Sequence, residues 1–243
     1  MVRTLPARPA PGSGVPPVRS RRGWAAAASV ITAAVLAWPA AASAEFQPQT
    51  HIDSLYPTAN ATWTCVNGVS GGATPTNLFC LTDNADTSWY TDSDDSNGSG
   101  DIRNRATFEL VLEREYDAKT ALSMRYQPNP KFSGSGETDI IFQQGNTGSA
   151  LGITWCNDAL EGTRECDQQY VRFASHNPGQ YLICHETGHA VGLTHGAQAN
   201  PVQAQDEPLM DCMRTGLPSV PGTTFAIIRA TLTSQLTAHY QNQ

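Results

Sequence analysis

The chain has 243 residues with 15 basic and 22 acidic side chains, a net charge of −7 at pH 7. Five of the arginines and none of the acidic residues fall in the first 44 positions, so the remainder has ten basic and 22 acidic side chains, a net charge of −12. A surface this acidic repels phosphate backbones and anionic lipids, which argues against nucleic acids and membrane surfaces as partners.

Residues 1–44 have the composition of a secretory signal peptide. A cluster of arginines precedes an apolar, alanine-rich run over Trp24–Ala42, and Ala42-Ser43-Ala44 is a small-x-small cleavage site. A membrane anchor is the alternative, but Pro39 interrupts the run, which is shorter than the roughly 20 residues that a membrane span needs. We therefore expect cleavage after Ala44 and a secreted, extracellular protein.

Residues 45–86 are rich in Thr, Asn, Gly and Pro and show little periodicity. They are typical of an irregular N-terminal extension or a short pro-segment, and the sequence does not say whether they are removed. Residues 87–243 then form the functional domain. The length left after removal of the signal peptide fits one domain with its own hydrophobic core, and we expect a monomer.

The first half of this domain predicts a strand, a helix and four further strands. A short strand over Thr87–Thr91 precedes the acidic loop Asp92–Asp101 and a helix over Ile102–Tyr116, where apolar residues recur at helical spacing. Carboxylates of the acidic loop suit Ca²⁺, but their spacing misfits an EF-hand and a solvated loop is the alternative. Four segments then have strand composition: Ala121–Gln127, Thr138–Gln144, Ala150–Cys156 and Tyr170–Ser175.

The second half predicts two helices around an irregular segment. Asn177-Pro178-Gly179-Gln180 combines a capping residue, a proline suited to the first helical position and a glutamine at the capping-box position. A helix should therefore run from Pro178 to about Val191, where Gly192 can end it. Apolar residues at helical spacing between Phe225 and Tyr240 predict a last helix. The pattern predicts an α+β domain with a mixed, twisted sheet of about five strands.

Six cysteines, an even number, follow the cleavage site, and none forms a CxxC pair. In an exported protein this pattern indicates three disulfides rather than a zinc ribbon. Many connectivities are compatible with the sequence. Pairing of neighbours closes the shortest loops, and it joins Cys65 to Cys80, Cys156 to Cys166, and Cys184 to Cys212.

Three of the six histidines lie in the stretch ICHETGHAVGLTHG, residues 183–196. His185 and His189 are four residues apart on the predicted helix, so both imidazoles project from one face. Glu186 borders that face and can reach water beside a bound metal. This is the HExxH arrangement, in which two histidines bind zinc and the glutamate acts as general base.

A catalytic zinc needs a third protein ligand and an open fourth position. If the helix continued, His195 would lie about 9 Å beyond His189 along the axis and on another face. Gly192 lacks a Cβ, so it can adopt a positive φ, end the helix and let His195 turn back to the metal. A purely structural zinc site and a core that merely contains hydrogen-bonded histidines are the alternatives, and a structural site leaves Glu186 unexplained.

The run from His185 to His195 resembles the HExxHxxGxxH motif of the metzincins, a clan of zinc endopeptidases that also carry a methionine turn. Met210 in EPLMDCM is similar to the methionine of matrixin-type members, and Met213 is the alternative. The residue after the third histidine is Gly196, and the turn lacks the tyrosine of astacin-like and serralysin-like members. An inhibitory cysteine motif of the matrixin kind is also absent. Matrixin-like members are therefore the nearest metzincins to this sequence, but the match to them is incomplete.

The resemblance extends from about Thr87 to the C-terminus and implies an active-site helix, a C-terminal helix and an antiparallel edge strand, here Ala150–Cys156. Extended peptide would bind along that edge through main-chain hydrogen bonds. The implied function is a secreted zinc endopeptidase in which Glu186 transfers the proton of water to the leaving amine. Two alternatives remain: a zinc-fold protein that binds peptide or cell-wall polymer without cleaving it, and a zinc amidase acting on peptidoglycan.

Overall fold

The computed structural model of the chain describes residues 64–68, 80–93, 101–199, 202–204, 206–215 and 230–241. The chain divides into two units, Met1–Glu45 and Phe46–Gln243, and the described residues all lie in the second. The predicted signal peptide, residues 1–44, and most of the segment 45–86 lie outside the described residues. Within the described part, no helix is both long and apolar enough to cross a membrane.

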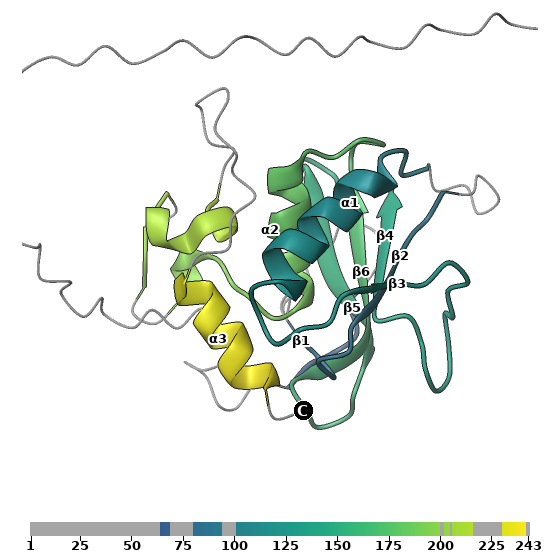
Figure 1. Cartoon of the computed structure of the whole chain (residues 1–243), viewed down its shortest axis with the longest axis horizontal. Coiled ribbons are helices and arrows are strands. Elements are labelled where there is room, and N and C mark those ends of the chain that lie inside the picture. Colours follow the sequence, from purple (N-terminus) through teal and green to yellow (C-terminus); the bar gives the residue numbers. More distant parts are fainter. Residues whose placement is uncertain are drawn as a thin grey trace, which may run out of the picture. The chain divides into compact units, whose positions relative to one another are not determined.

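A six-stranded sheet forms the centre of the described part (Figure 1). β6 pairs with three strands: β5 lies along one side of it in antiparallel orientation, and β1 and β4 pair with the other side in parallel. β2 and β3 continue the sheet beyond β4, also in parallel. The strands are β1 (Leu81–Thr82), β2 (Ser88–Thr91), β3 (Arg125–Tyr126), β4 (Ile140–Gln144), β5 (Gly152–Ala159) and β6 (Glu165–Phe173).

The sequence predicts about five strands, and the structure adds β1. Leu81 and Thr82 pair with the first residues of β6, inside the segment expected to be irregular. Two residues are too few to show alternation, so only the pairing with β6 defines this strand. The boundaries of the other strands shift, most of all in β3, which has two residues where Ala121–Gln127 is predicted.

The α-helices of the described part all match predicted helices, with shifted ends. α1 (Arg105–Val111) continues as a π-helical turn, η2 (Leu112–Asp117), and lies beside α2 (Gln180–Ala190) over one face of the sheet (Figure 1). α2 begins two residues later than predicted, with Gly179 at the N-cap position. α3 (Ala230–Tyr240) lies within the predicted C-terminal helix, and residues 225–229 of that prediction lie outside the described part.

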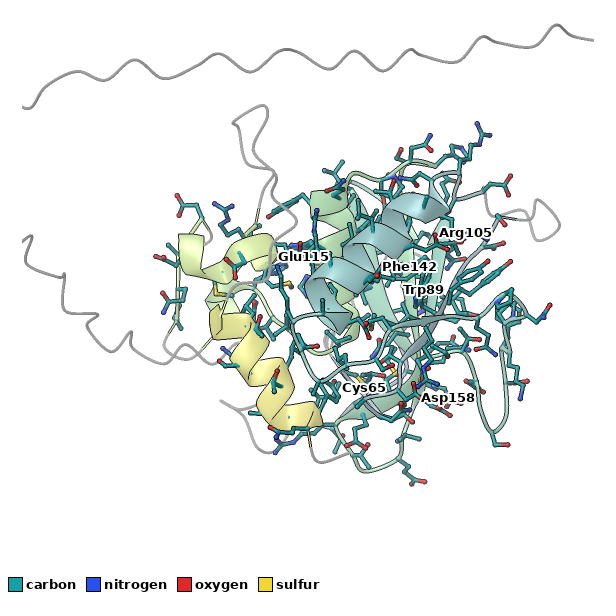
Figure 2. The ribbon with its side chains drawn as sticks, in the orientation of Figure 1. Cys65, Trp89, Arg105, Glu115, Phe142 and Asp158 are labelled. Atoms are coloured by element: carbon teal, nitrogen blue, oxygen red, sulfur yellow. A yellow bond between two sulfur atoms is a disulfide. The ribbon has the colours of Figure 1, made fainter. Side chains whose placement is uncertain are left out.

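One hydrophobic core lies between the helices and the sheet. Phe108 of α1 packs with Phe142 and Phe173 of the sheet, with ring centroids 4.9 to 6.3 Å apart. Trp89 lies beside Phe142 in the same layer (Figure 2). α2 contacts α1, β5 and β6 together, and its residues from Ile183 to Ala190 are all buried. Its polar side chains are therefore held inside the core.

Two 3-10 segments, η3 (Gly196–Gln198) and η4 (Pro208–Met213), follow α2. The three predicted disulfides are all present, with Cα–Cα distances of 5.5, 5.8 and 6.0 Å. Such a set of disulfides is typical of proteins in oxidising compartments. The bond between Cys184 and Cys212 joins α2 to η4, and the bond between Cys65 and Cys80 fastens the segment 64–68 beside β1.

Candidate metal centre

α2 and the turn that follows it bring His185, His189 and His195 together. The three Nε2 atoms lie 3.0 to 3.2 Å from one another. A tetrahedral ion with Zn–N bonds of about 2.0 to 2.1 Å places two nitrogen ligands roughly 3.3 Å apart. The three imidazoles can therefore hold a single metal ion at their common centre.

Gly192 turns the chain so that His195 reaches the other two histidines. Its φ is +93°, the left-handed conformation predicted from the sequence. The N–H of Gly192 bonds to the carbonyl of His189 and the N–H of Leu193 to that of Gly188, which is the Schellman pattern of a helix end. A Cβ on Gly192 would also lie 2.6 Å from Cδ2 of Leu81. Both the backbone conformation and the packing against β1 thus require glycine here.

Backbone carbonyls orient two of the imidazoles. Nδ1 of His185 donates to the carbonyl oxygen of Cys212 at 2.6 Å, and Nδ1 of His189 donates to that of Leu193 at 2.8 Å. A carbonyl oxygen can only accept, so each Nδ1 carries the proton and each Nε2 keeps its lone pair for a metal. The ring planes are set by the same two bonds.

Burial keeps the imidazoles neutral. Burial and, to a smaller extent, the nearby His195 together lower the pKa of His185 to about 4, against the hydrogen bond to Cys212. The pKa of His189 is well below its ordinary value, first through burial and then through the two neighbouring histidines, and burial also lowers that of His195. Neutral imidazole is the form that binds metal, so a cation displaces no proton from these rings at pH 7.

Glu186 is buried and its carboxyl group faces β5. The hydroxyl of Thr154 donates to Oε2 of Glu186 at 2.8 Å. A Cβ on Gly152 would lie 2.6 Å from Oε1, so glycine at this point makes room for the carboxyl group. Burial raises the pKa of Glu186 to about 7, and the Thr154 hydrogen bond acts in the opposite direction. A carboxyl group with a pKa near 7 can accept and return a proton at neutral pH.

The sequence alone does not identify Thr154 or Gly152 as residues that contact Glu186. A glycine inside a strand is a known signal for the close approach of another group, and Gly152 carries that signal. Thr154 has no such signal, because threonine is an ordinary strand residue.

η4 supplies both candidate methionines. Met210 and Met213 are fully buried in the main core. The sulfur of Met213 lies against Gly188, where a Cβ would overlap it, so Met213 packs on α2 at the residue that precedes His189. Asp211 has a φ of +50° and a ψ of −124°, a conformation that residues other than glycine rarely adopt, and this kink precedes the Cys212 carbonyl that accepts from His185.

Two buried tyrosines bind backbone carbonyls in the middle of α2 and just after its last residue. The hydroxyl of Tyr116, in η2, donates to the carbonyl of Cys184 at 2.5 Å. The hydroxyl of Tyr240, in α3, donates to the carbonyl of Val191 at 3.1 Å and accepts from the N–H of Thr82 at 3.1 Å. Burial raises the pKa of both tyrosines, so they remain protonated and can donate.

A second cluster of titratable groups lies at the other end of β5 and β6. Carboxylate oxygens of Asp83, Asp139 and Asp167 lie within 4.8 Å of one another, and so do those of Glu137, Asp158 and Asp167. We call these five residues the carboxylate cluster. It is separate from the loop at 92–101 that the sequence singles out for calcium, whose residues 94–100 lie outside the described part.

Asp139 is the most strongly perturbed member of the carboxylate cluster. Its side chain is only 5% exposed, and burial raises its pKa to about 6. Hydrogen bonds from the N–H and the hydroxyl of Ser88, both 2.6 Å, favour the charged form and limit this rise. Ionisation of the Asp139 carboxyl group therefore lowers the stability of the folded state.

No model of a known protein family matches the chain, and no curated protein matches it in sequence. The chemistry of the centre must therefore be inferred from its residues. They are three neutral imidazoles directed at one point and a buried carboxyl group on the same helix, a set that can bind a cation and handle a proton beside it.

Proposed function

We propose that this protein is a secreted, zinc-dependent peptidase of the metzincin type. The observation that carries the proposal is the approach of the three histidine Nε2 atoms to within 3.2 Å of one another, next to Glu186 on α2. Three nitrogen donors suit zinc and leave one tetrahedral position for water or substrate. A bound zinc ion would polarise the peptide carbonyl and lower the pKa of water.

Glu186 is the proposed general base. Thr154 binds Oε2, so Oε1 is the atom we assign to the proton of the attacking water. The carboxyl group then passes this proton to the amine that leaves. Two buried carbonyl acceptors hold His185 and His189 in place while this occurs, so their Nε2 atoms need no reorganisation.

Other features support the metzincin assignment, for which matrixin-like members remain the nearest form that we propose. Gly192 ends α2 inside the HExxHxxGxxH run, and buried methionines follow in η4 before α3. β5 is an antiparallel edge strand beside an otherwise parallel sheet, as the resemblance implies for the strand that binds extended peptide. The disulfides agree with export to an oxidising environment, and a protein or peptide is the substrate we propose.

Hydrolysis assays on the full secreted chain test the proposal. We expect cleavage of casein that a chelator stops and added zinc restores. Glu186→Gln should retain zinc and lose roughly 10²- to 10⁴-fold in turnover, because the amide cannot accept the proton. Glu109→Gln, on the exposed side of α1, is the matched control and should behave like the parent protein.

The same assay separates the alternatives. Zinc-dependent release of fragments from cell walls, without cleavage of casein, would indicate an amidase. Retention of peptide or wall polymer without any cleavage, unchanged by Glu186→Gln, would indicate a binding protein. Near-parental turnover in Glu186→Gln would show that the general base is wrongly assigned.

A further inference from the structure

The chain itself covers part of the outer edge of β5. The N–H of Gly68 donates to the carbonyl of Cys156 at 2.7 Å, and the N–H of Ala159 donates to Oδ1 of Asn67 at 2.6 Å. Asn67 thus lies beside Ala159 and Gly68 beside Cys156, so the segment Thr64–Gly68 runs antiparallel to β5. We call Thr64–Gly68 the amino-terminal arm.

The amino-terminal arm is firmly attached at this place. Cys65 forms the disulfide with Cys80, and its N–H bonds to the carbonyl of Thr163 at 2.8 Å. Gly68 lies so close to Trp155 that a Cβ would be 2.6 Å from the Cβ of the tryptophan. Figure 2 shows Cys65 and Asp158 at the same end of the sheet. A peptide pairing with the end of β5 would have to displace this fastened segment.

The orientation of the backbone N–H and C=O groups along β5 shows which residues a bound peptide can pair with. The carbonyl of Leu151 accepts from the N–H of Ala174, so Leu151 faces β6, while the carbonyl of Cys156 faces the amino-terminal arm. Backbone groups of successive strand residues alternate between the two sides. Gly152 and Thr154 therefore direct their N–H and C=O groups to the same outer edge as Cys156.

The proposed general base lies beside these same two residues. The carboxyl group of Glu186 accepts the Thr154 hydrogen bond and occupies the space over Gly152. A strand rises about 3.3 Å per residue, so Cys156 lies roughly 7 Å beyond Thr154 along the edge. Among the described residues, the edge between the carboxyl group of Glu186 and the amino-terminal arm therefore spans about two residues of an extended peptide.

We propose that the amino-terminal arm closes one end of the peptide-binding edge and limits the substrate to about two or three residues on the amino side of the cut. The inference rests on the proposed function. β5 pairs antiparallel with β6 and with the arm, and a peptide bound in this manner runs from Cys156 toward Gly152. Its amino end then meets the arm, and its carboxyl part leaves past Gly152. The preferred substrates are peptides and proteins with accessible amino ends.

A series of peptides with one cleavable sequence and amino-side extensions of increasing length tests this closure. The carboxyl side is kept constant, and kcat/KM is measured with the full chain. We expect kcat/KM to fall at least tenfold once the amino side exceeds about three residues. Equal rates for short and long amino sides would overturn the inference.

Variants of the amino-terminal arm test its cause. Asn67→Ala removes one hydrogen bond to β5, and the pair C65S/C80S releases the arm from β1. We expect both to raise kcat/KM for long amino sides relative to short ones, the disulfide variant by about tenfold or more. Asp117→Ala is the matched control, because Asp117 also accepts a backbone N–H, that of Met124, far from β5.

An unchanged ratio between long and short peptides in both arm variants would refute the role of the arm, and Asn67→Ala gives this answer even if the disulfide variant folds poorly. Failure of the proposed function has a different result: peptides of every length remain intact, or Glu186→Gln cleaves them like the parent. The inference would then fall with the function.

Discussion

The histidine centre and the carboxylate cluster lie at opposite ends of β5, and each contains sets of three ligand atoms within 4.8 Å of one another. Burial acts on them in opposite ways. It lowers the pKa of His185 to about 4 and leaves a neutral ring, but it raises the pKa of Asp139 to about 6 and makes its charged form costly. Neutral imidazoles can be buried in the metal-free fold, whereas buried carboxylates oppose folding when they ionise.

The two clusters also differ in how they are held. Carbonyl groups of η4 and of the turn after α2 fix the imidazoles, and the disulfide between Cys184 and Cys212 fastens η4 to α2. Asp139 is held by Ser88 of the neighbouring strand. The difference suggests that the histidine centre is built for a ligand, because its donors are fixed and uncharged before any ligand arrives.

The largest expected effect separates the two clusters by metal affinity. His195→Ala leaves two imidazoles to bind zinc. Loss of a group that only hydrogen-bonds a metal ligand lowers affinity by roughly 10- to 100-fold, and we expect loss of the ligand itself to lower zinc affinity by more than this. Asp167→Asn, in the carboxylate cluster, should leave it unchanged. Zinc retention in competition with a chelator measures both, and full retention in His195→Ala would show that the third ligand is misassigned.

The second prediction compares two disulfides. Replacing Cys184 and Cys212 by serine opens a loop with a sequence separation of 28 and should cost about 3 to 4 kcal/mol in the chain-entropy model. Replacing Cys156 and Cys166, with a separation of 10, should cost slightly less. Only the first change should also weaken zinc binding, because the carbonyl of Cys212 orients His185. Denaturant unfolding and zinc competition on both variants check this.

A third prediction concerns the turn after α2. Gly192→Ala places a Cβ at a φ of +93° and against Leu81, so it should lower the free energy of unfolding by about 2 to 3 kcal/mol. Gly162→Ala is a matched control, because its φ is +75° but its Cβ would meet no atom within 4 Å. A loss no greater than in the control would mean that packing against β1 contributes nothing.

The smallest effect is the pH dependence of the carboxylate cluster. The folded-state pKa of Asp139 is about 6, above the value of roughly 3.9 in an unfolded chain, so its contribution to stability is fully present below pH 4 and is lost as pH rises through 6. The loss should be about 2 to 3 kcal/mol, which is the free energy that corresponds to a pKa difference of about two. Asp139→Asn should remove this part of the pH profile in denaturant unfolding, and an unchanged profile would contradict the assignment.

The sequence alone determines the parts of the centre that lie on one helix and its end. Helical geometry converts the four-residue spacing of His185 and His189 into a common direction, and glycine at position 192 is the residue that permits a left-handed stop. Disulfides between neighbouring cysteines are accessible for a similar reason, since short loops cost little entropy to close. Local geometry and chain connectivity are sufficient for these predictions.

Only the tertiary structure decides what surrounds the centre. Cys212 and His185 are separated by 27 residues, Thr154 and Glu186 by 32, and Asn67 and Ala159 by 92. Two of these contacts use backbone groups, which every residue carries and which leave no trace in side-chain composition. β1 and the amino-terminal arm are likewise too short for periodicity, so their pairing with β6 and β5 follows from the packed fold and not from local preference.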